Sequence, residues 1–168
     1  MNHLETVYFA GGCFWCITPT FREMEGVYGV ISGYSGGDEV NPSYEDVKSQ
    51  KTSHRETIRV DYDPCIVSFE KLFDIFLASV NPFDPDGQFI DRGHSYTLAV
   101  YYLNETQKRI SLEGIRRLEE AEEMQAFIAV EPFKSFYPAE EYHQDYDRKN
   151  PEAFRRELID SGRIRPEE

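Results

Sequence analysis

The sequence predicts an α/β fold in a single domain spanning residues 1–168. Short runs of strand-type residues alternate along the chain with stretches whose apolar residues recur at helical spacing. With 168 residues and 40% hydrophobic content, the chain is long and apolar enough to bury one core. The predicted order is βαββαβ followed by one more helix and strand. This order is the split pattern of a ferredoxin-like α/β sandwich.

The first strand is predicted at residues 6–10, where an apolar run leads into a double glycine. A short helix is expected after it, around residues 21–24. Pro19 lacks a backbone N–H, so it either distorts the first turn of this helix or stands at its start with Thr18 as the cap. Two more strands are predicted at residues 27–34 and 55–62, and the second alternates polar and apolar side chains.

The second half of the predicted core begins at Ser68, which caps a helix with a continuous apolar face. Asn81-Pro82 ends that helix, and an irregular stretch leads to a strand at residues 96–103. Asn104, followed three residues later by Gln107, predicts the start of a helix that reaches about residue 123. A last strand is expected at residues 126–130. From Pro132 onward we predict mostly irregular chain with short helices.

Composition excludes several classes of function. The formal charge of −13 argues against nucleic acid as a partner, because phosphate binding needs clustered Lys and Arg. No run approaches the roughly 18 apolar residues of a membrane span, and the first residues do not have the pattern of a signal peptide. We therefore expect a cytoplasmic monomer that binds neither nucleic acid nor membranes.

The segment Gly12-Cys13-Phe14-Trp15-Cys16 carries the chemistry that the sequence predicts. Glycines before Cys13 allow a tight turn and close approach of a ligand, so we expect Cys13 in an exposed mouth. At the start of a helix its thiol would have a lowered pKa and react as thiolate. Phe14 and Trp15 would form the walls of an apolar pocket.

The three cysteines favour redox chemistry over a structural role. An odd, small number is unsuited to a disulfide scaffold. A zinc site would need a second CxxC or a pair of histidines, and the four histidines do not have that spacing. We therefore expect no metal and no cofactor. A thioredoxin-like disulfide oxidoreductase and a non-enzymatic module that binds through its aromatic mouth remain alternatives.

Several motifs together resemble peptide methionine sulfoxide reductase A over about residues 6–150. They are GCFWC at 12–16, GYSGG, NPSY at 41–44, HRE at 54–56, DRGHSY at 91–96 and FYPAEEYHQDY at 136–146. The resemblance implies an α/β sandwich that reduces the S epimer of free or peptide-bound methionine sulfoxide. It also implies thioredoxin, or another thiol, as the final reductant.

Reduction of a sulfoxide by a thiol needs a nucleophile and an acid. By resemblance Cys13 is the nucleophile, which becomes a sulfenic acid, and Glu56 is the acid. Tyr44 and Tyr96 match the hydroxyls that bind the sulfoxide oxygen, with Asp91 as a polar partner. Phe14 and Trp15 match the walls around the substrate methyl group.

Four positions have simpler interpretations that the residues alone leave open. Glu56 would be a solvated strand residue in most proteins. Asp91, beside Arg92, would ordinarily form a surface charge pair of little value. His143, like His54, could be a hydrogen-bonded structural histidine.

The resolving thiol is the main departure from the family. Many members carry resolving cysteines in a glycine-rich C-terminal tail, and this chain ends without one. Cys16 is the first candidate, because CxxC spacing permits a disulfide across a turn. Cys65 is expected to be structural.

Overall fold

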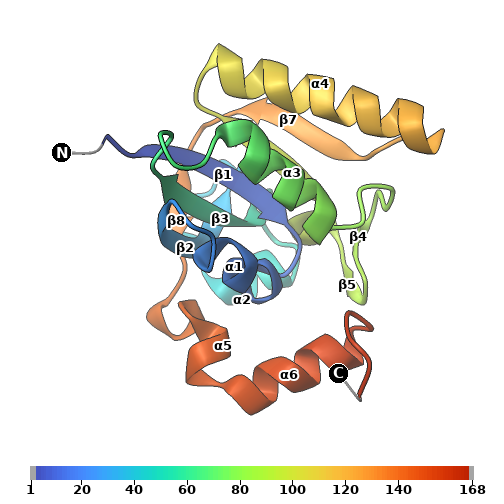
Figure 1. Cartoon of the computed structure of the whole chain (residues 1–168). Helices are drawn as coiled ribbons and strands as arrows, with labels where there is room; N and C mark the ends of the chain where they lie inside the picture. Colours follow the sequence, from blue (N-terminus) through green and yellow to red (C-terminus); the bar gives the residue numbers. More distant parts are fainter. Residues whose placement is uncertain (1–2, 167–168) are drawn as a thin grey trace.

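The computed structural model describes residues 3–166 and has a mixed α/β fold built on a six-stranded sheet (Figure 1). Its strands are β1 (Glu5–Gly11), β2 (Val27–Ser35), β3 (Arg55–Tyr62), β6 (Leu98–Tyr102), β7 (Ile128–Pro132) and β8 (Phe136–Pro138). Their order across the sheet is β7-β6-β1-β3-β2-β8. Neighbouring strands are antiparallel except β6 and β7, which are parallel and joined through a helix. A separate hairpin contains β4 (Gly87–Gln88) and β5 (Asp91–Arg92).

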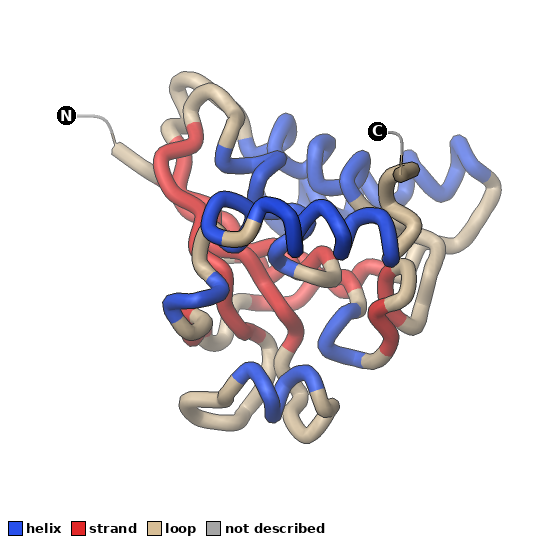
Figure 2. The backbone as a smooth tube through the Cα atoms, turned by 90° about the horizontal axis from the view of Figure 1, so that it is seen from below, coloured by secondary structure: helices blue, strands red, loops and turns tan. Residues whose placement is uncertain are grey.

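The helices are α1 (Phe14–Arg22), α2 (Tyr44–Lys48), α3 (Phe69–Ser79), α4 (Glu105–Glu122), α5 (Tyr146–Lys149) and α6 (Pro151–Asp160), with 3₁₀ helices η1 (His94–Tyr96) and η2 (Glu141–His143). Helices α1 and α3 pack on one face of the sheet, and α4 packs against α3 and β7. The α5–α6 segment crosses the molecule on the side of α1 (Figures 1 and 2). Within residues 3–166, no helix is both long and apolar enough to cross a membrane.

Strand β1 is buried on both of its faces. Successive side chains of a strand point to opposite faces, so Val7 and Phe9 enter the core under α1 and α3. The Phe9 ring stacks on Phe76 of α3, with ring centroids 4.6 Å apart. On the opposite face Tyr8 stacks on Phe133, at 4.4 Å. This double burial explains why the first strand is apolar at consecutive positions.

The predicted strands and capped helices agree with the structure to within about two residues, whereas the first helix was placed wrongly. Helix α1 begins at Phe14, directly after Cys13. Thr18 is not its cap, because its hydroxyl lies inside the helix and donates to the Phe14 carbonyl at 2.7 Å. Pro19 also lies inside α1.

The C-terminal part of the chain is more regular than predicted. Strand β8 adds to the edge of the sheet beside β2, and α6 is a helix of ten residues. Pro151 opens α6, where a missing N–H has no cost. The strand was missed because its pairing with β2 depends on contacts far away in the sequence.

Antiparallel pairing gathers the ends of several strands at one end of the sheet. Phe9 pairs with Ile58, so the same register brings the end of β1 level with Glu56. Glu56 itself pairs with Tyr34 of β2. On the other side Gly11 pairs with Leu98, two residues after Tyr96. The glycine turn, the start of β3 and the loop before β6 therefore meet at this end of the sheet.

We expect Gly114 of α4 to tolerate no side chain. A Cβ added there would lie 2.6 Å from the ring of Phe73 on α3. Alanine favours a helix over glycine by about 1 kcal/mol, yet Gly114→Ala should lower the free energy of unfolding by about 1–3 kcal/mol, because the two helices must separate. Urea denaturation measures the change. Glu120→Ala, at an exposed position of α4, is the control and should stay within about 0.5 kcal/mol of wild type. Equal stability of the Gly114 variant would contradict this packing.

Candidate active site

The turn between β1 and α1 places Cys13 at the helix N-terminus. Gly12 adopts φ +83°, a conformation that side chains disfavour, and a Cβ there would lie 2.9 Å from the Gln88 side chain. Cys13 is the N-cap residue of α1 but is only 6% exposed. The expectation of an exposed Cys13 is therefore wrong. Of the two cysteines in this turn, Cys16 is the more accessible, because it is partly exposed.

The pKa of the Cys13 thiol is raised well above its ordinary value, not lowered as the sequence suggested. A hydrogen bond with the Cys16 side chain is the largest cause, and burial is the second. The nearby charges of Glu56 and Asp91 disfavour a thiolate further. These effects outweigh the helix N-terminus, so Cys13 rests as a thiol. The two cysteines also share the first turn of α1, where the Cys16 N–H donates to the Cys13 carbonyl at 3.1 Å.

Glu56 lies on the core-facing side of β3 and is 2% exposed. One of its carboxyl oxygens accepts the Phe14 N–H, the first amide of α1, at 3.2 Å. Burial raises the pKa of Glu56 to about 8, against the opposing effects of the Phe14 N–H and the Tyr96 hydroxyl. The side chain is therefore a protonated acid at neutral pH. A solvated strand position, the simpler interpretation of Glu56, is wrong.

Tyr44, Tyr96 and Asp91 all interact electrostatically with this carboxyl. Burial raises the pKa of both tyrosines, and the charges of Glu56, Asp91 and Cys13 raise it further. Both phenols are therefore neutral donors. Burial also raises the pKa of Asp91. The structure thus brings together the five polar residues that the resemblance selected.

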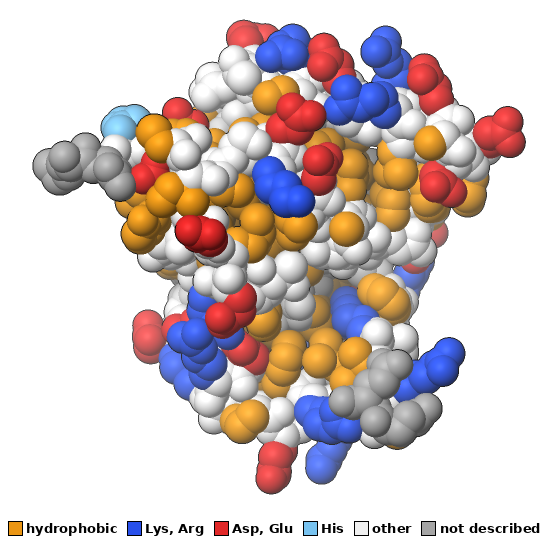
Figure 3. Space-filling view, in the orientation of Figure 1, with side chains coloured by type: hydrophobic (Ala, Val, Ile, Leu, Met, Phe, Trp, Pro, Cys, Tyr) orange, Lys and Arg blue, Asp and Glu red, His pale blue; other side chains and the backbone are white. Residues whose placement is uncertain are grey.

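The aromatic residues beside Cys13 form a layered cluster. Phe14 has no exposed surface and backs the cluster, whereas Trp15 is half-buried. The Trp15 indole stacks on Tyr146, with centroids 3.9 Å apart, and its Nε1–H donates to Nδ1 of His143 at 3.1 Å. His143 is thus a hydrogen-bonded histidine, as the sequence allowed. In Figure 3 apolar side chains gather where the C-terminal segment faces the main body of the molecule.

Comparison with known proteins gives this constellation a family. The family model for peptide methionine sulfoxide reductase matches residues 5–165, nearly the whole chain. The chain belongs to this family. It is an oxidoreductase that reduces methionine sulfoxide, and the residues described above lie within the matched range.

Individual relatives agree with this membership. The peptide methionine sulfoxide reductase MsrA of Bacillus licheniformis is 44% identical over 161 residues, which cover 95% of this chain and 89% of the relative. Methionine sulfoxide reductase A of Corynebacterium diphtheriae superposes with a TM-score of 0.80 at 29% identity, covering 88% of this chain and 76% of that chain. Reduced Mxr1 from Saccharomyces cerevisiae gives a TM-score of 0.84 at 26% identity, covering 89% and 87%.

Two residues that the sequence interpretation did not select also contact residues of the site. Glu140 accepts the Tyr34 hydroxyl at 2.8 Å and the Tyr44 N–H at 3.1 Å, which fixes the start of α2. It lies within the FYPAEEYHQDY motif, so the motif was the available signal. Arg163 pairs with Asp91 at 3.5 Å, and its position gave no local signal.

The neighbouring arginine is not the partner of Asp91. Arg92 pairs with Asp84 at 2.6 Å instead. A surface pair between Asp91 and Arg92, the simpler interpretation of this dipeptide, is therefore wrong.

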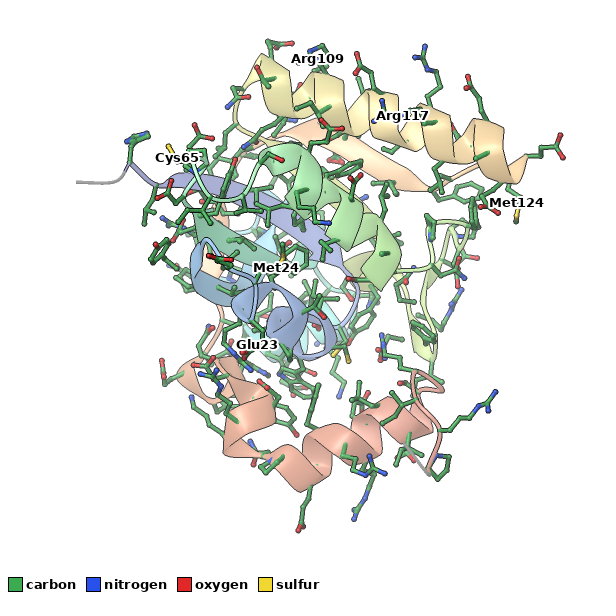
Figure 4. The ribbon with its side chains drawn as sticks, in the orientation of Figure 1. Glu23, Met24, Cys65, Arg109, Arg117 and Met124 are labelled. Atoms are coloured by element: carbon green, nitrogen blue, oxygen red, sulfur yellow. The ribbon has the colours of Figure 1, made fainter. Side chains whose placement is uncertain are left out.

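Cys65 lies at the opposite end of β1 from Cys13. Glu5 pairs with Tyr62, so the loop that carries Cys65 follows the strand end beside the start of β1. Figure 4 places Cys65 at that margin of the reductase. The seven residues of β1 extend for roughly 20 Å. A disulfide between Cys65 and Cys13 would require the fold to open.

We expect the buried acid to make the stability of the reductase depend on pH. The pKa of Glu56 rises from 4.5 to about 8 on folding, so its stabilisation is complete below about 4.5 and is lost as pH rises to about 8. Glu56→Gln cannot ionise. Relative to this variant, wild type should lose roughly 1.4 kcal/mol per pH unit within that window and nothing further above it.

Urea denaturation across this pH range measures the difference between the two proteins. Glu120→Gln, at an exposed position of α4, is the control and should follow wild type. A constant difference between wild type and Glu56→Gln at every pH would show that Glu56 does not take up a proton on folding.

Proposed function

We propose that Cys13 reduces the S epimer of methionine sulfoxide, free or in proteins, with Glu56 as the acid. The observation that carries this proposal is a carboxyl with a pKa of about 8 that binds the amide next to Cys13. Such an acid is protonated at neutral pH and close enough to its ordinary range to release its proton. Tyr44 and Tyr96, with Asp91 beside them, would bind the sulfoxide oxygen. Trp15, backed by Phe14, would hold the methyl group.

The reaction balances with these groups alone. The Cys13 sulfur attacks the sulfoxide sulfur while Glu56 donates its proton to the oxygen. The Glu56 carboxylate that forms is the base nearest to the Cys13 thiol and takes its proton. The oxygen passes to Cys13, which becomes a sulfenic acid, and methionine leaves with a reduced sulfur. A resting thiol with a raised pKa is compatible with this sequence, because the net charge of the site does not change.

We propose that Cys16 resolves the sulfenic acid. Its thiol attacks the Cys13 sulfur, water leaves, and a Cys13–Cys16 disulfide forms. Their CxxC spacing within one helical turn supports this pairing, since the Cys16 N–H bonds to the Cys13 carbonyl at 3.1 Å. Thioredoxin, or another thiol, would then attack the partly exposed sulfur of Cys16 and release Cys13. No metal or cofactor takes part in this scheme.

The architecture supports further proposals about the fold, the domain organisation and the location of the protein. We infer that β1-α1-β2-β3-α3-β6 is a ferredoxin-like core, because its strands lie in the order β6-β1-β3-β2 and pair antiparallel. We also propose that the chain acts as a single domain and a monomer, since the acid, the two thiols and the two phenols of the site all lie at one end of a single sheet. We further propose a cytoplasmic location, because three unpaired cysteines fit reducing conditions.

The acid and the nucleophile can be tested on separated sulfoxide epimers. Cys13→Ser should abolish reduction, because a hydroxyl is a poor nucleophile toward sulfur. Glu56→Gln should slow the single-turnover rate by about 10²–10⁴-fold while it still binds substrate. Wild type should reduce only the S epimer. Equal rates on both epimers, or an unchanged rate for the glutamine variant, would refute the proposed site; circular dichroism checks the fold of each variant.

The resolving thiol can be tested with Cys16→Ser and its control, Cys65→Ser. With thioredoxin as reductant, Cys16→Ser should release about one methionine per enzyme and then stop, because no disulfide can form for thioredoxin to open. Dithiothreitol should partly restore its turnover. Cys65→Ser should turn over normally. Steady thioredoxin-driven turnover by Cys16→Ser, or a Cys13–Cys65 peptide in oxidised wild type, would refute the assignment.

A further inference from the structure

The C-terminal segment of the reductase returns to the active site through Arg163. The segment passes α1 and brings the chain after α6 next to β5 (Figures 1 and 2). There the Arg163 guanidinium lies 3.5 Å from the Asp91 carboxylate and 4.4 Å above the centre of the Phe89 ring. The Arg163 and Asp91 side chains are only 12% and 19% exposed. An ion pair this well shielded is screened little by salt.

The end of α6 is shaped to deliver this arginine. Gly162 has φ +83°, and its N–H bonds to the Ile159 carbonyl. The Arg163 N–H bonds to the Leu158 carbonyl at 2.9 Å. These two bonds form the glycine-terminated helix end known as a Schellman motif, which reverses the chain at a fixed angle. Arg163 is therefore held by the backbone as well as by its charge.

Asp91 depends on Arg163 for most of its charge compensation. Its Oδ2 makes no hydrogen bond with any described residue. Arg163 is the main group that lowers its pKa, and Lys48 of α2 is the second. The other titratable groups that face Asp91 are Glu56 of β3, Glu157 of α6 and the site residues Cys13, Tyr44 and Tyr96. Their ionised forms are all anionic.

A small cavity lies beside this pair. Its volume is about 210 Å³, and its lining includes Cys16 and Ile17 of α1, Phe89, Leu158 and Arg163. Arg163 thus closes one side of a space that Cys16 also lines. The Nη1 group of Arg163 has no hydrogen-bond partner among the described residues. The guanidinium pairs with Asp91 through Nη2.

We propose that Arg163 is a positioning residue: it fixes Asp91 as a carboxylate against the catalytic cluster and thereby keeps Glu56 in its acid form. The inference rests on the proposed role of Glu56. Asp91 acts directly on Glu56, and its negative charge disfavours a second carboxylate beside it. A cation on the far side of Asp91 therefore favours the protonated form of the acid.

Removal of Arg163 should reverse this effect. A shielded carboxylate without its cationic partner takes up a proton more readily, so the pKa of Asp91 would rise further in the absence of Arg163. The charge that disfavours ionisation of Glu56 would then be lost, and Glu56 would ionise at lower pH. Loss of the arginine charge also acts on Glu56 directly, and this effect alone would raise the Glu56 pKa. It is the smaller effect, because Asp91 and Lys48 are the main charges that affect Glu56.

The test is the pH dependence of single-turnover reduction by the prereduced enzyme. In wild type the rate should fall as pH rises through about 8, where Glu56 ionises. In Arg163→Met this fall should occur at lower pH, by on the order of one pH unit. Arg163→Lys, which keeps the charge, should retain most of the wild-type pH profile. Arg156→Met, at an exposed position of α6, is the matched control and should behave as wild type.

A merely structural arginine would give a different result. If Arg163 only anchored the segment, Arg163→Met would lower the rate equally at every pH, and the proposal would be overturned. A second test uses the Asp91→Asn variant, in which Arg163→Met should cause no further shift of the pH profile. An equal shift with and without Asp91 would show that Arg163 does not act through it.

Carboxyl titration by ¹³C NMR separates this inference from the proposed function, because it needs no substrate. The Glu56 signal, assigned by its loss in Glu56→Gln, should titrate at lower pH in Arg163→Met than in wild type. If wild type failed to reduce methionine sulfoxide, the proposed function would fall, and this titration would still decide the link between Arg163 and Glu56. An unmoved Glu56 titration in a folded Arg163→Met protein would overturn the link.

Discussion

The hydrogen bond between the Glu56 carboxyl and the first amide of α1 is the contact on which the site depends. It joins the start of β3 to the turn that carries Cys13. A helix N-terminus favours a carboxylate, whereas burial away from water favours the neutral acid. Burial is the stronger effect here, and the pKa of about 8 is the result. The amide still lowers the cost of ionisation, so the same contact that holds the acid in place lets it release a proton.

Much of this arrangement follows from local sequence patterns. The strand at residues 55–62 was predicted with its observed bounds, and its alternation places Glu56 on the same face as Ile58 and Val60. A carboxyl at a core-facing position is itself a signal, because burial raises its pKa. The capped helices were equally predictable, since Ser68 and Asn104 both accept an amide of the first turn.

The remaining features depend on contacts that no local pattern records. The start of α1 was missed because Cys13 provides no side-chain cap, and the acceptor for the Phe14 amide comes from a strand far along the chain. The raised pKa of Cys13 reflects burial and neighbouring anions, neither of which the GCFWC motif specifies. Arg163 was one basic residue among several until the end of α6 brought it to Asp91.

In the proposed redox cycle, the unequal burial of the two cysteines would let one turn serve both the reduction of the sulfoxide and the recycling of the enzyme. A sulfenic acid is open to further, irreversible oxidation when it is exposed. On Cys13, which is 6% exposed, a sulfenic acid would be shielded from solvent, and the proposed resolving thiol lies three residues away. In the proposed Cys13–Cys16 disulfide, Cys16 would be the more exposed of the two residues and the one that a reductant attacks. That attack would release Cys13 in its buried position, beside an acid that has recovered its proton. The difference in burial between the two cysteines would thus keep the reduction of the sulfoxide apart from the exchange of thiols.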